Sequence, residues 1–187
     1  MIVTLDGLPG SGNTTATQKV AELLKYKVIT TGEIWKNMAQ KYGVAPENFS
    51  DFWKKEGGGE NLHKKIDQMQ INKAKEAKEK GEKVILNGKL AAAMLKDIAD
   101  IKIFLIAPFE VRIKRVMNRE KTEYDETKKE IEERFKHEIE DWTKIYGINY
   151  TDQKYYDIIL NTGNLNKEQM TKTIANIIKN WEETVCQ

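Results

Sequence analysis

Short apolar runs alternate along the chain with longer stretches in which apolar residues recur every three or four positions. The runs have the length of buried strands, and the stretches have the period of amphipathic helices. Strands that alternate with helices in this way predict an α/β protein with a parallel sheet. The five predicted strands lie at about residues 2–5, 27–30, 83–86, 101–106 and 156–160.

The stretches between and after the strands predict seven helices. They lie at about residues 14–25, 32–42, 47–55, 61–80, 108–119, 123–145 and 167–183. Gly57, Gly58 and Gly59 predict a flexible break before the fourth helix, and Gly81 stands where a glycine would follow its C-cap. No repeat or linker divides the chain, so we expect a single domain over residues 1–187.

The composition fits a folded domain at the polar end of the globular range, with 40% hydrophobic and 32% charged residues. No apolar stretch approaches the ~20 residues that cross a bilayer. The chain enters its first strand without the leader of a secreted protein, and Cys186 alone forms no internal disulfide. We therefore expect a cytosolic protein without membrane contacts. The balance of 31 basic and 29 acidic residues argues against a nucleic-acid partner.

Arginine is rare and clustered. Only four of the 31 basic residues are arginine, and Arg112, Arg115 and Arg119 fall within eight positions, with Arg134 further along. Arginine offers phosphate oxygens a planar, bidentate fork that lysine lacks, so these positions are candidate anion contacts. Steps of three and four place the first three on one helical face. Genome base composition, or a solvated helix paired with Glu110, would give the same pattern.

A glycine-rich turn joins the first predicted strand to the first predicted helix. It comprises Gly7, Leu8, Pro9, Gly10, Ser11, Gly12, Asn13, Thr14 and Thr15. A strand, this spacing and a helix are the context of a P-loop, GxxxxGK followed by Ser or Thr. Its backbone N–H groups surround phosphate oxygens, and the helix N-terminus adds a favourable dipole. An ordinary strand-to-helix turn would not need so many glycines.

Asn13 departs from the P-loop motif, because it stands where the motif has lysine. An amide donates hydrogen bonds but does not neutralise the charge that develops on phosphate. The loss of one well-placed donor typically costs about 10²–10³ in rate. Another cation would have to supply that charge, or the chemistry would be slow.

The sequence resembles the archaeal-type cytidylate kinases, a branch of the nucleoside monophosphate kinases. The glycine-rich turn and several later segments carry this resemblance. The resemblance runs from Met1 to about Glu183, and some members of the branch also lack the P-loop lysine. Its segments are GLPGSGNTT at 7–15, TTGEIWKNMA at 30–39, ILNGKLAAAML at 85–95, IFLIAPFEVRIKRVMNRE at 103–120, KIYGIN at 144–149 and YDIILNT at 156–162. The order and spacing of the segments are specific, whereas each later segment alone is weak.

The resemblance implies a P-loop three-layer sandwich with a five-stranded parallel sheet, an acceptor-binding insert at about 31–80 and a mobile lid at about 116–145. It implies transfer of the ATP γ-phosphate to CMP or dCMP with Mg²⁺, and we expect a monomer that binds these small nucleotides. Without the resemblance, the charged stretch at 119–140 is either such a lid or a solvated helical face.

The resemblance also assigns roles to residues. Residues 7–15 take the ATP-binding positions. Thr14 takes a Mg²⁺-binding position, and Asn87 takes another, at which it would act through a water molecule. The expected catalytic residues are Asn13, Arg112, Arg115, Arg119 and Arg134. The expected acceptor-binding residues are Thr31, Gly32, Lys36, Lys64, Asp67, Gly88 and Lys89. Asp67 would read the edge of the base.

Several of these positions depart from the family pattern. Asn87 replaces a carboxylate, and lysine replaces arginine at 36, 64 and 89, which keeps the charge but loses the bidentate fork. Asp6 stands where the family usually has a small residue; it either partly replaces the missing carboxylate at position 87, or it only caps or repels. These departures leave two alternatives open: a nucleotide-binding homologue with weak or no transferase activity, or a kinase for another small acceptor.

The remaining conspicuous residues predict no further chemistry. His63 and His137 lack metal-ligand spacing and are interpreted as surface residues. The four tryptophans are interpreted as packing residues, although Trp35 and Trp53 lie in helices of the expected acceptor side. No Ser-His-Asp or Cys-His arrangement is present, which agrees with phosphoryl transfer because this reaction needs no covalent nucleophile.

Overall fold

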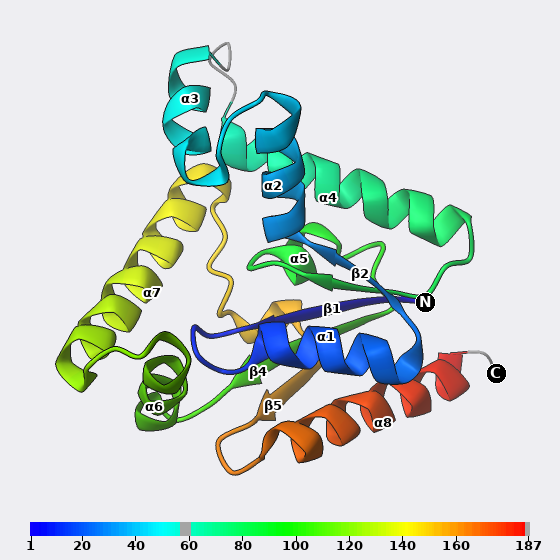
Figure 1. The fold of residues 1–187 in the computed structure, drawn as a ribbon. Helices are drawn as coiled ribbons and strands as arrows, with labels where there is room; N and C mark the ends of the chain where they lie inside the picture. Colours follow the sequence, from blue (N-terminus) through cyan, green and yellow to red (C-terminus); the bar gives the residue numbers. More distant parts are fainter. Residues whose placement is uncertain (57–60, 186–187) are drawn as a thin grey trace.

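The protein folds around one five-stranded parallel sheet with the strand order β2-β3-β1-β4-β5 (Figure 1). The computed structural model describes residues 1–56 and 61–185. The predicted glycine break at 57–59 and Cys186 lie outside these residues. The strands are β1 (Ile2–Gly7), β2 (Lys27–Thr30), β3 (Val84–Asn87), β4 (Ile101–Ile106) and β5 (Ile158–Asn161). The prediction of an α/β protein with a five-stranded parallel sheet is confirmed.

In the described residues, helices connect these strands along the chain, and α8 follows the last strand. They are α1 (Asn13–Leu24), α2 (Thr31–Lys41), α3 (Phe49–Glu56), α4 (Leu62–Glu79), α5 (Ala91–Met94), α6 (Phe109–Glu120), α7 (Tyr124–Tyr146) and α8 (Lys167–Val185). Two short 3₁₀ helices, η1 (Pro46–Asn48) and η2 (Gln153–Tyr155), complete the elements. No helix in these ranges has the length and apolar character needed to span a membrane.

Alternating side chains of the central strand β1 bind helices to both faces of the sheet. Val3 and Leu5 pack against α1 and α8, whereas Ile2 belongs to a second cluster with residues of α4. Successive side chains of a strand point to opposite faces, so a strand buried on both sides is apolar throughout. The helices therefore form two layers around the sheet, as Figure 1 shows for α1 and α8 on one face and α4 and α5 on the other.

The predicted helix bounds agree with the observed ones to within two residues, with two exceptions. The helix predicted at 47–55 is divided into η1 and α3, because Pro46 opens the segment as a 3₁₀ turn. The four-residue helix α5 was not predicted, because it is shorter than the window in which a helical period is detectable.

The topology directs three connections to one edge of the sheet. The loop after β1, the start of α2 directly after β2, and the loop after β3 all leave from the carboxyl ends of parallel strands, where α/β proteins bind ligands. The long helix α7 lies beside this edge in Figure 1. A functional site is therefore expected between these loops and α7.

Candidate functional site

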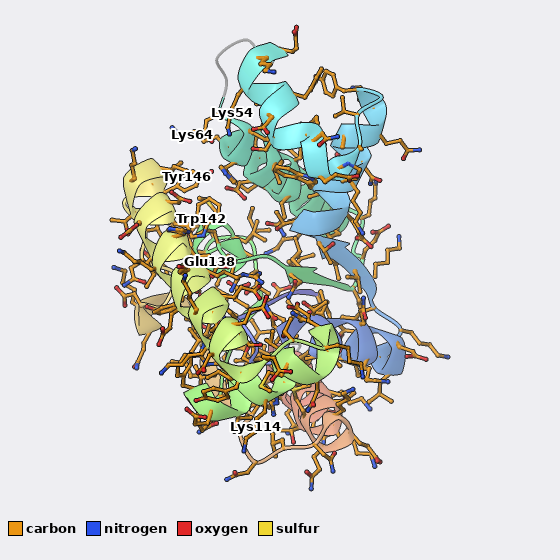
Figure 2. All side chains as sticks on the ribbon, turned by 60° about the vertical axis from the view of Figure 1, so that its left-hand side comes forward. Lys54, Lys64, Lys114, Glu138, Trp142 and Tyr146 are labelled. Atoms are coloured by element: carbon orange, nitrogen blue, oxygen red, sulfur yellow. The ribbon has the colours of Figure 1, made fainter. Side chains whose placement is uncertain are left out.

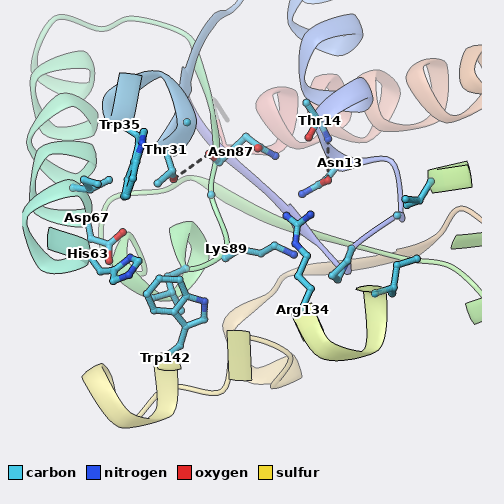
Figure 3. A pocket seen from close by; sticks show the side chains of 18 of the residues that line it. Asn13, Thr14, Thr31, Trp35, His63, Asp67, Asn87, Lys89, Arg134 and Trp142 are labelled. Carbon is cyan, nitrogen blue, oxygen red and sulfur yellow. Dashed lines mark hydrogen bonds between the residues drawn. The ribbon is translucent and has the colours of Figure 1, made fainter. Parts of the chain in front are cut away.

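A cavity of about 380 Å³ opens at this edge of the sheet (Figure 3). Its lining comes from the loops after β1 and β3 and from helices α1, α2, α4, α6 and α7. The residues are Pro9, Gly10, Asn13, Thr14, Thr31, Gly32, Trp35, His63, Ile66, Asp67, Asn87, Gly88, Lys89, Leu90, Val116, Arg119, Glu130, Ile131, Arg134 and Trp142. Glycines and cations surround one end of the cavity, which we call the phosphate end after the ligand that the sequence predicts there. Aromatic side chains with Asp67 surround the other end, which we call the aromatic end or, after its expected ligand, the base end.

The P-loop, residues 7–15, reverses direction tightly between β1 and α1. The Leu8 N–H donates to the Leu105 carbonyl at 3.1 Å, and the Ser11 N–H donates to the Leu8 carbonyl at 3.0 Å. Gly10 has φ of +80°, and a Cβ there would lie 2.9 Å from the carbonyl oxygen of Arg112. Only glycine fits that backbone conformation and that close approach. The sequence therefore places the N-terminus of α1 at the cavity.

Asn13 turns its side chain back on its own helix. Its Oδ1 accepts the Thr14 N–H at 2.9 Å. The first N–H groups of a helix have no partner within the helix, so this bond satisfies one of them. The side-chain amide nitrogen of Asn13 remains as a donor at the phosphate end of the cavity. Asn13 thus supplies a dipole, but no charge, where the P-loop motif has an ammonium group.

Arg112 and Arg115 hold the P-loop from outside the cavity. The Arg112 guanidinium donates to the Pro9 carbonyl at 3.1 Å, and that of Arg115 donates to the Ser11 carbonyl at 3.1 Å. Arg115 also donates to the hydroxyl of Thr162 at 2.9 Å and to its carbonyl. Neither arginine lines the cavity. Their donors are directed at backbone carbonyls, which fixes the shape of the loop.

Arg119 and Arg134 line the cavity, and both have acidic partners on their own helix. Arg119 pairs with the adjacent Glu120 and is largely exposed. The Arg134 Nε donates to Glu138 Oε1 at 3.0 Å, and Figure 3 shows its guanidinium directed toward the end of the cavity that carries Asn13. Of these two, Arg134 thus directs its guanidinium group toward the phosphate end.

Lys89 is the most buried cation of the cavity. Its ammonium group donates to the Gly7 carbonyl at 3.1 Å and lies 3.0 Å from a carboxylate oxygen of Glu138. Burial lowers the pKa of Lys89, and the negative charge of Glu138 opposes that shift. The ring of Tyr150 lies 5.2 Å below the ammonium group, within the range of a cation–π contact. Lys89 thus places a positive charge directly beneath the start of the P-loop.

Asn87, at the end of β3, lines the cavity between the P-loop and α2. Its Nδ2 donates to the Leu5 carbonyl at 2.8 Å, which leaves the amide oxygen as the acceptor it offers. Thr31 lines the cavity beside it. A Cβ at Gly88 would clash with the Thr31 hydroxyl oxygen and would lie 3.0 Å from the side-chain amide nitrogen of Gln70, so a larger residue would force these neighbours to shift. Asn87 and Thr14 are oxygen donors of the kind Mg²⁺ prefers, but both are neutral.

Asp6 lies buried beneath the P-loop and does not line the cavity. Its Oδ2 accepts the Ala92 N–H at 3.1 Å, so the carboxylate caps α5. Burial raises the pKa of Asp6 to about 7, against the lowering effects of this bond and of Lys89. Of the two roles considered for Asp6, the structure shows the cap.

The far end of the cavity is aromatic and acidic. Asp67 accepts a hydrogen bond from the Tyr146 hydroxyl at 2.5 Å, and burial raises its pKa. The ring of His63 lies edge-on to Trp142 with centroids 5.0 Å apart. Trp35 lines the cavity from α2 (Figure 3). These side chains form a wall of flat rings with one oriented carboxyl group, an arrangement suited to a planar ligand with a donor edge.

The structure brings twelve of the expected site residues to the cavity. They are Pro9, Gly10, Asn13, Thr14, Thr31, Gly32, Asp67, Asn87, Gly88, Lys89, Arg119 and Arg134. Gly7, Leu8, Ser11, Gly12, Thr15, Arg112 and Arg115 lie in or against the P-loop without lining the cavity, and Lys36 and Lys64 are exposed on α2 and α4. The roles that the resemblance implies for these residues stay predictions.

Eight of the lining residues are not among the site residues expected from the sequence, and His63, Trp142 and Glu130 are three of them. His63 and Trp142 were assigned to the surface and to packing. They lie on α4 and α7, far apart in the sequence, and no spacing pattern connects them. Only the packing of α7 against the carboxyl end of the sheet brings them together.

Comparison with solved structures identifies the class of fold. The shikimate kinase from Acinetobacter baumannii superimposes with a TM-score of 0.58 at 17% identity, covering 96% of this chain and 93% of that one. A shikimate kinase from Aquifex aeolicus gives a TM-score of 0.52 over 96% of this chain and 97% of that one, at 23% identity. The architecture is therefore that of the P-loop kinases.

Sequence comparison identifies the family within this class. The cytidylate kinase-like family model matches residues 2–164. The cytidylate kinase of Methanopyrus kandleri is 36% identical, over 90% of this chain and 88% of that protein. The cytidylate kinase of Methanobrevibacter smithii is 34% identical, over 96% of this chain and 99% of that protein. The chain belongs to the cytidylate kinase-like family, and the resemblance seen in the sequence is confirmed.

Proposed function

We propose that this protein transfers the γ-phosphate of ATP to CMP or dCMP. An oxygen of the acceptor phosphate bonds to the γ-phosphorus, and the bond to the β–γ bridging oxygen breaks, which releases ADP and CDP or dCDP. The observation that carries the proposal is the two-ended cavity, in which a P-loop and cations face a wall of rings with one carboxyl group. Relatives named cytidylate kinase over most of the chain support it.

The phosphate end binds ATP in this proposal. Backbone N–H groups of residues 7–15 surround the phosphates, with the N-terminus of α1 adding its dipole. Arg112 and Arg115 contribute by fixing the carbonyls of Pro9 and Ser11, so that the loop keeps its shape when charge enters. Preorganised donors of this kind stabilise a transition state without reorganising during the reaction.

Lys89, Arg119 and Arg134 supply the positive charge that Asn13 does not. All three line the cavity. Charge spreads over the transferred phosphoryl group during the reaction, and cations positioned around it are the main catalytic contribution of a kinase. Lys36 and Lys64 lie outside this lining, and they would reach the acceptor phosphate only after a movement of α2 and α4.

Mg²⁺ fits this end through Thr14 and, by way of a water molecule, Asn87. Both side chains line the cavity and offer oxygen atoms, whereas neither carries charge. Such a donor set suits a Mg²⁺ ion that nucleotide phosphates largely hold, with the protein orienting it. The ion would neutralise charge on the phosphates.

The aromatic end binds the base of the acceptor. Trp35, Trp142 and His63 offer ring faces and edges for stacking. Asp67 is held by Tyr146 and offers its remaining oxygen as an acceptor. Cytosine presents an exocyclic amino group as a donor, whereas uracil presents a carbonyl oxygen at that position. A carboxylate acceptor therefore favours cytosine over uracil.

Helix α7 acts as part of a lid in this proposal, and residues 31–80 act as the acceptor-binding insert. Arg134 of α7 lines the phosphate end, and Trp142 of the same helix lines the base end. One helix thus contacts both substrates, and its closure would exclude water that otherwise hydrolyses ATP. We further propose a cytoplasmic monomer with these nucleotides as its ligands.

One observation favours a second candidate, a nucleotide-binding homologue with weak transferase activity. The P-loop lysine is absent, and Asn13 Oδ1 already occupies the Thr14 N–H. The N-terminus of α1 would then hold a nucleotide without stabilising the transition state strongly. A different small acceptor remains a variant of the first candidate, since lysine replaces arginine at three expected acceptor contacts.

A coupled assay of ADP release decides between the candidates. The protein is supplied with ATP, Mg²⁺ and each of CMP, dCMP, UMP, AMP and GMP, and ATP without acceptor gives the hydrolysis control. We expect turnover of ~1–100 s⁻¹ with CMP or dCMP. Absence of turnover with every acceptor, together with ATP binding measured by calorimetry, contradicts the proposed kinase and supports the second candidate.

A further inference from the structure

Glu138 of α7 has an environment unlike that of an ordinary surface carboxylate. Its side chain is 14% exposed. Its Oε2 lies 3.0 Å from the ammonium group of Lys89 and accepts the hydroxyl of Tyr150 at 2.9 Å, while its Oε1 accepts the Nε of Arg134 at 3.0 Å. Both carboxylate oxygens are therefore used, and this one side chain orients all three donors. Figure 2 shows the position of Glu138 on α7.

Other carboxylates of α7 show the contrast. Glu133 and Glu140 each pair with a lysine four residues earlier at 3.8 Å, and both are 58% exposed. Exposed pairs of this kind contribute little to stability, because solvent screens them. A carboxylate buried as deeply as that of Glu138 is costly unless it is paired and hydrogen-bonded. Its position indicates a specific task.

Two partners of Glu138 belong to the phosphate end of the cavity. Lys89 and Arg134 both line it, and Lys89 also donates to the Gly7 carbonyl at the start of the P-loop. Two cations held this close together repel each other. The carboxylate between them offsets that repulsion, and the buried ring of Tyr150 supports the arrangement from below. Figure 3 shows both cations reaching toward the same part of the cavity.

We infer that Glu138 is a positioning residue for phosphoryl transfer: it joins Lys89 and Arg134 into one cationic unit that replaces the missing P-loop lysine. The inference rests on the proposed function. It explains why a negative charge lies behind the phosphate end of the cavity, since Glu138 contacts the cations and not the ligand. It also connects α7 to the P-loop through Lys89, so that the lid helix carries half of the unit.

If Glu138 positions the two cations, its replacement should change kcat and KM in a way that loss of a purely structural residue would not. Replacement of Glu138 by glutamine makes the cavity more positive by one charge, so attraction of the acceptor phosphate is maintained. The two cations lose their fixed separation, and misplacement by about 1 Å costs about 10²-fold in rate. We therefore expect Glu138→Gln to lower kcat about 10–100-fold with an unchanged or lower KM for CMP.

Glu140→Gln is the matched control, because it removes a carboxylate of the same helix whose partner is the exposed Lys136. It should match the unaltered protein in kcat, KM and thermal midpoint. If Glu138→Gln does not fold, Glu138→Asp retains the charge but withdraws it from both cations, and the same kcat effect is expected. A kcat within twofold of the Glu140→Gln value, or a raised KM with normal kcat, overturns the inference.

A second measurement does not require turnover. The chain contains only four arginines, so its arginine Nε–Hε NMR spectrum holds four signals, and Arg134→Lys identifies the signal of Arg134. In the unliganded protein and in Glu140→Gln we expect that signal to exchange slowly, because Glu138 accepts this hydrogen. Glu138→Gln should exchange it at least tenfold faster, and an unchanged rate contradicts the inference. Lack of turnover by the unaltered protein contradicts the proposed function alone, and the NMR result then decides the role of Glu138.

Discussion

The two ends of the cavity are built in different ways. The phosphate end is formed largely by one continuous segment, the P-loop and the first residues of α1, and backbone atoms supply much of its binding capacity. The base end is formed only by side chains, from α2, α4 and α7, which are far apart in the sequence. Under the proposed function, phosphate recognition thus depends on the path of the chain, whereas base recognition depends on how three helices pack.

This difference predicts that substitutions separate into two kinds. Changes at the phosphate end should alter the rate with every acceptor alike, because all acceptors share the same phosphate chemistry. Changes at the base end should alter the choice among acceptors. The following substitutions test that separation.

The largest effect is expected for Lys89→Met. It removes the buried charge beneath the P-loop, and loss of one preorganised donor costs about 10²–10³ in kcat. Steady-state assays with CMP and UMP should show the same proportional loss. Lys89→Arg is the control, because it retains a positive charge that can pair with Glu138. A normal kcat for Lys89→Met would remove Lys89 from the catalytic proposal.

Asp67→Asn tests the base end. The asparagine presents a donor as well as an acceptor, so the hydrogen bond to the amino group of cytosine is no longer specified. We expect kcat/KM for CMP to fall about 10–10²-fold while the value for UMP changes little. Tyr146→Phe removes the hydrogen bond that orients the Asp67 carboxyl group but leaves that group in place. We expect a smaller fall in kcat/KM for CMP from this variant. An equal loss for both acceptors contradicts a role in base selection.

Asn13→Lys restores the residue of the P-loop motif. If Lys89 and Arg134 already supply the charge, the gain in kcat should remain below about tenfold, less than the usual cost of one missing donor. The double variant Asn13→Lys/Asn87→Asp, which also restores a carboxylate, should add little more. A rise of several orders of magnitude from a nearly inactive parent would instead favour the nucleotide-binding homologue.

Asp6→Asn should have the smallest effect, and on stability rather than on rate. Burial raises the pKa of Asp6 from 3.8 to about 7, so the folded protein binds a proton there that the unfolded chain has released. This contribution to stability is complete below pH 4 and is lost as pH rises through about 7. Chemical denaturation at several pH values should show that Asp6→Asn removes this decline. If the stability of Asp6→Asn and that of the unaltered protein change with pH in parallel, the expected contribution of Asp6 is contradicted.

The sequence predicted the strands, most helices and the P-loop, because each is encoded locally by period, apolar runs and glycine spacing. It did not predict the positions of Arg112 and Arg115 outside the P-loop, since a helical face in the sequence does not specify what that face meets. The environment of Glu138 was equally hidden: Arg134 lies four residues earlier on the same helix, but Lys89 and Tyr150 come from other segments, and only the folded chain brings them to Glu138.

The bond between Asn13 and the Thr14 N–H has a consequence for nucleotide loading. Asn13 Oδ1 accepts the Thr14 N–H, so a phosphate oxygen would have to displace it to use that donor. Because Oδ1 is attached to the chain, its effective concentration at this N–H stays constant. A single inorganic anion gains few contacts in exchange for displacing it, whereas a triphosphate engages several donors of the loop at once. In the proposed kinase, the resting P-loop would therefore disfavour a single small anion relative to a polyphosphate chain.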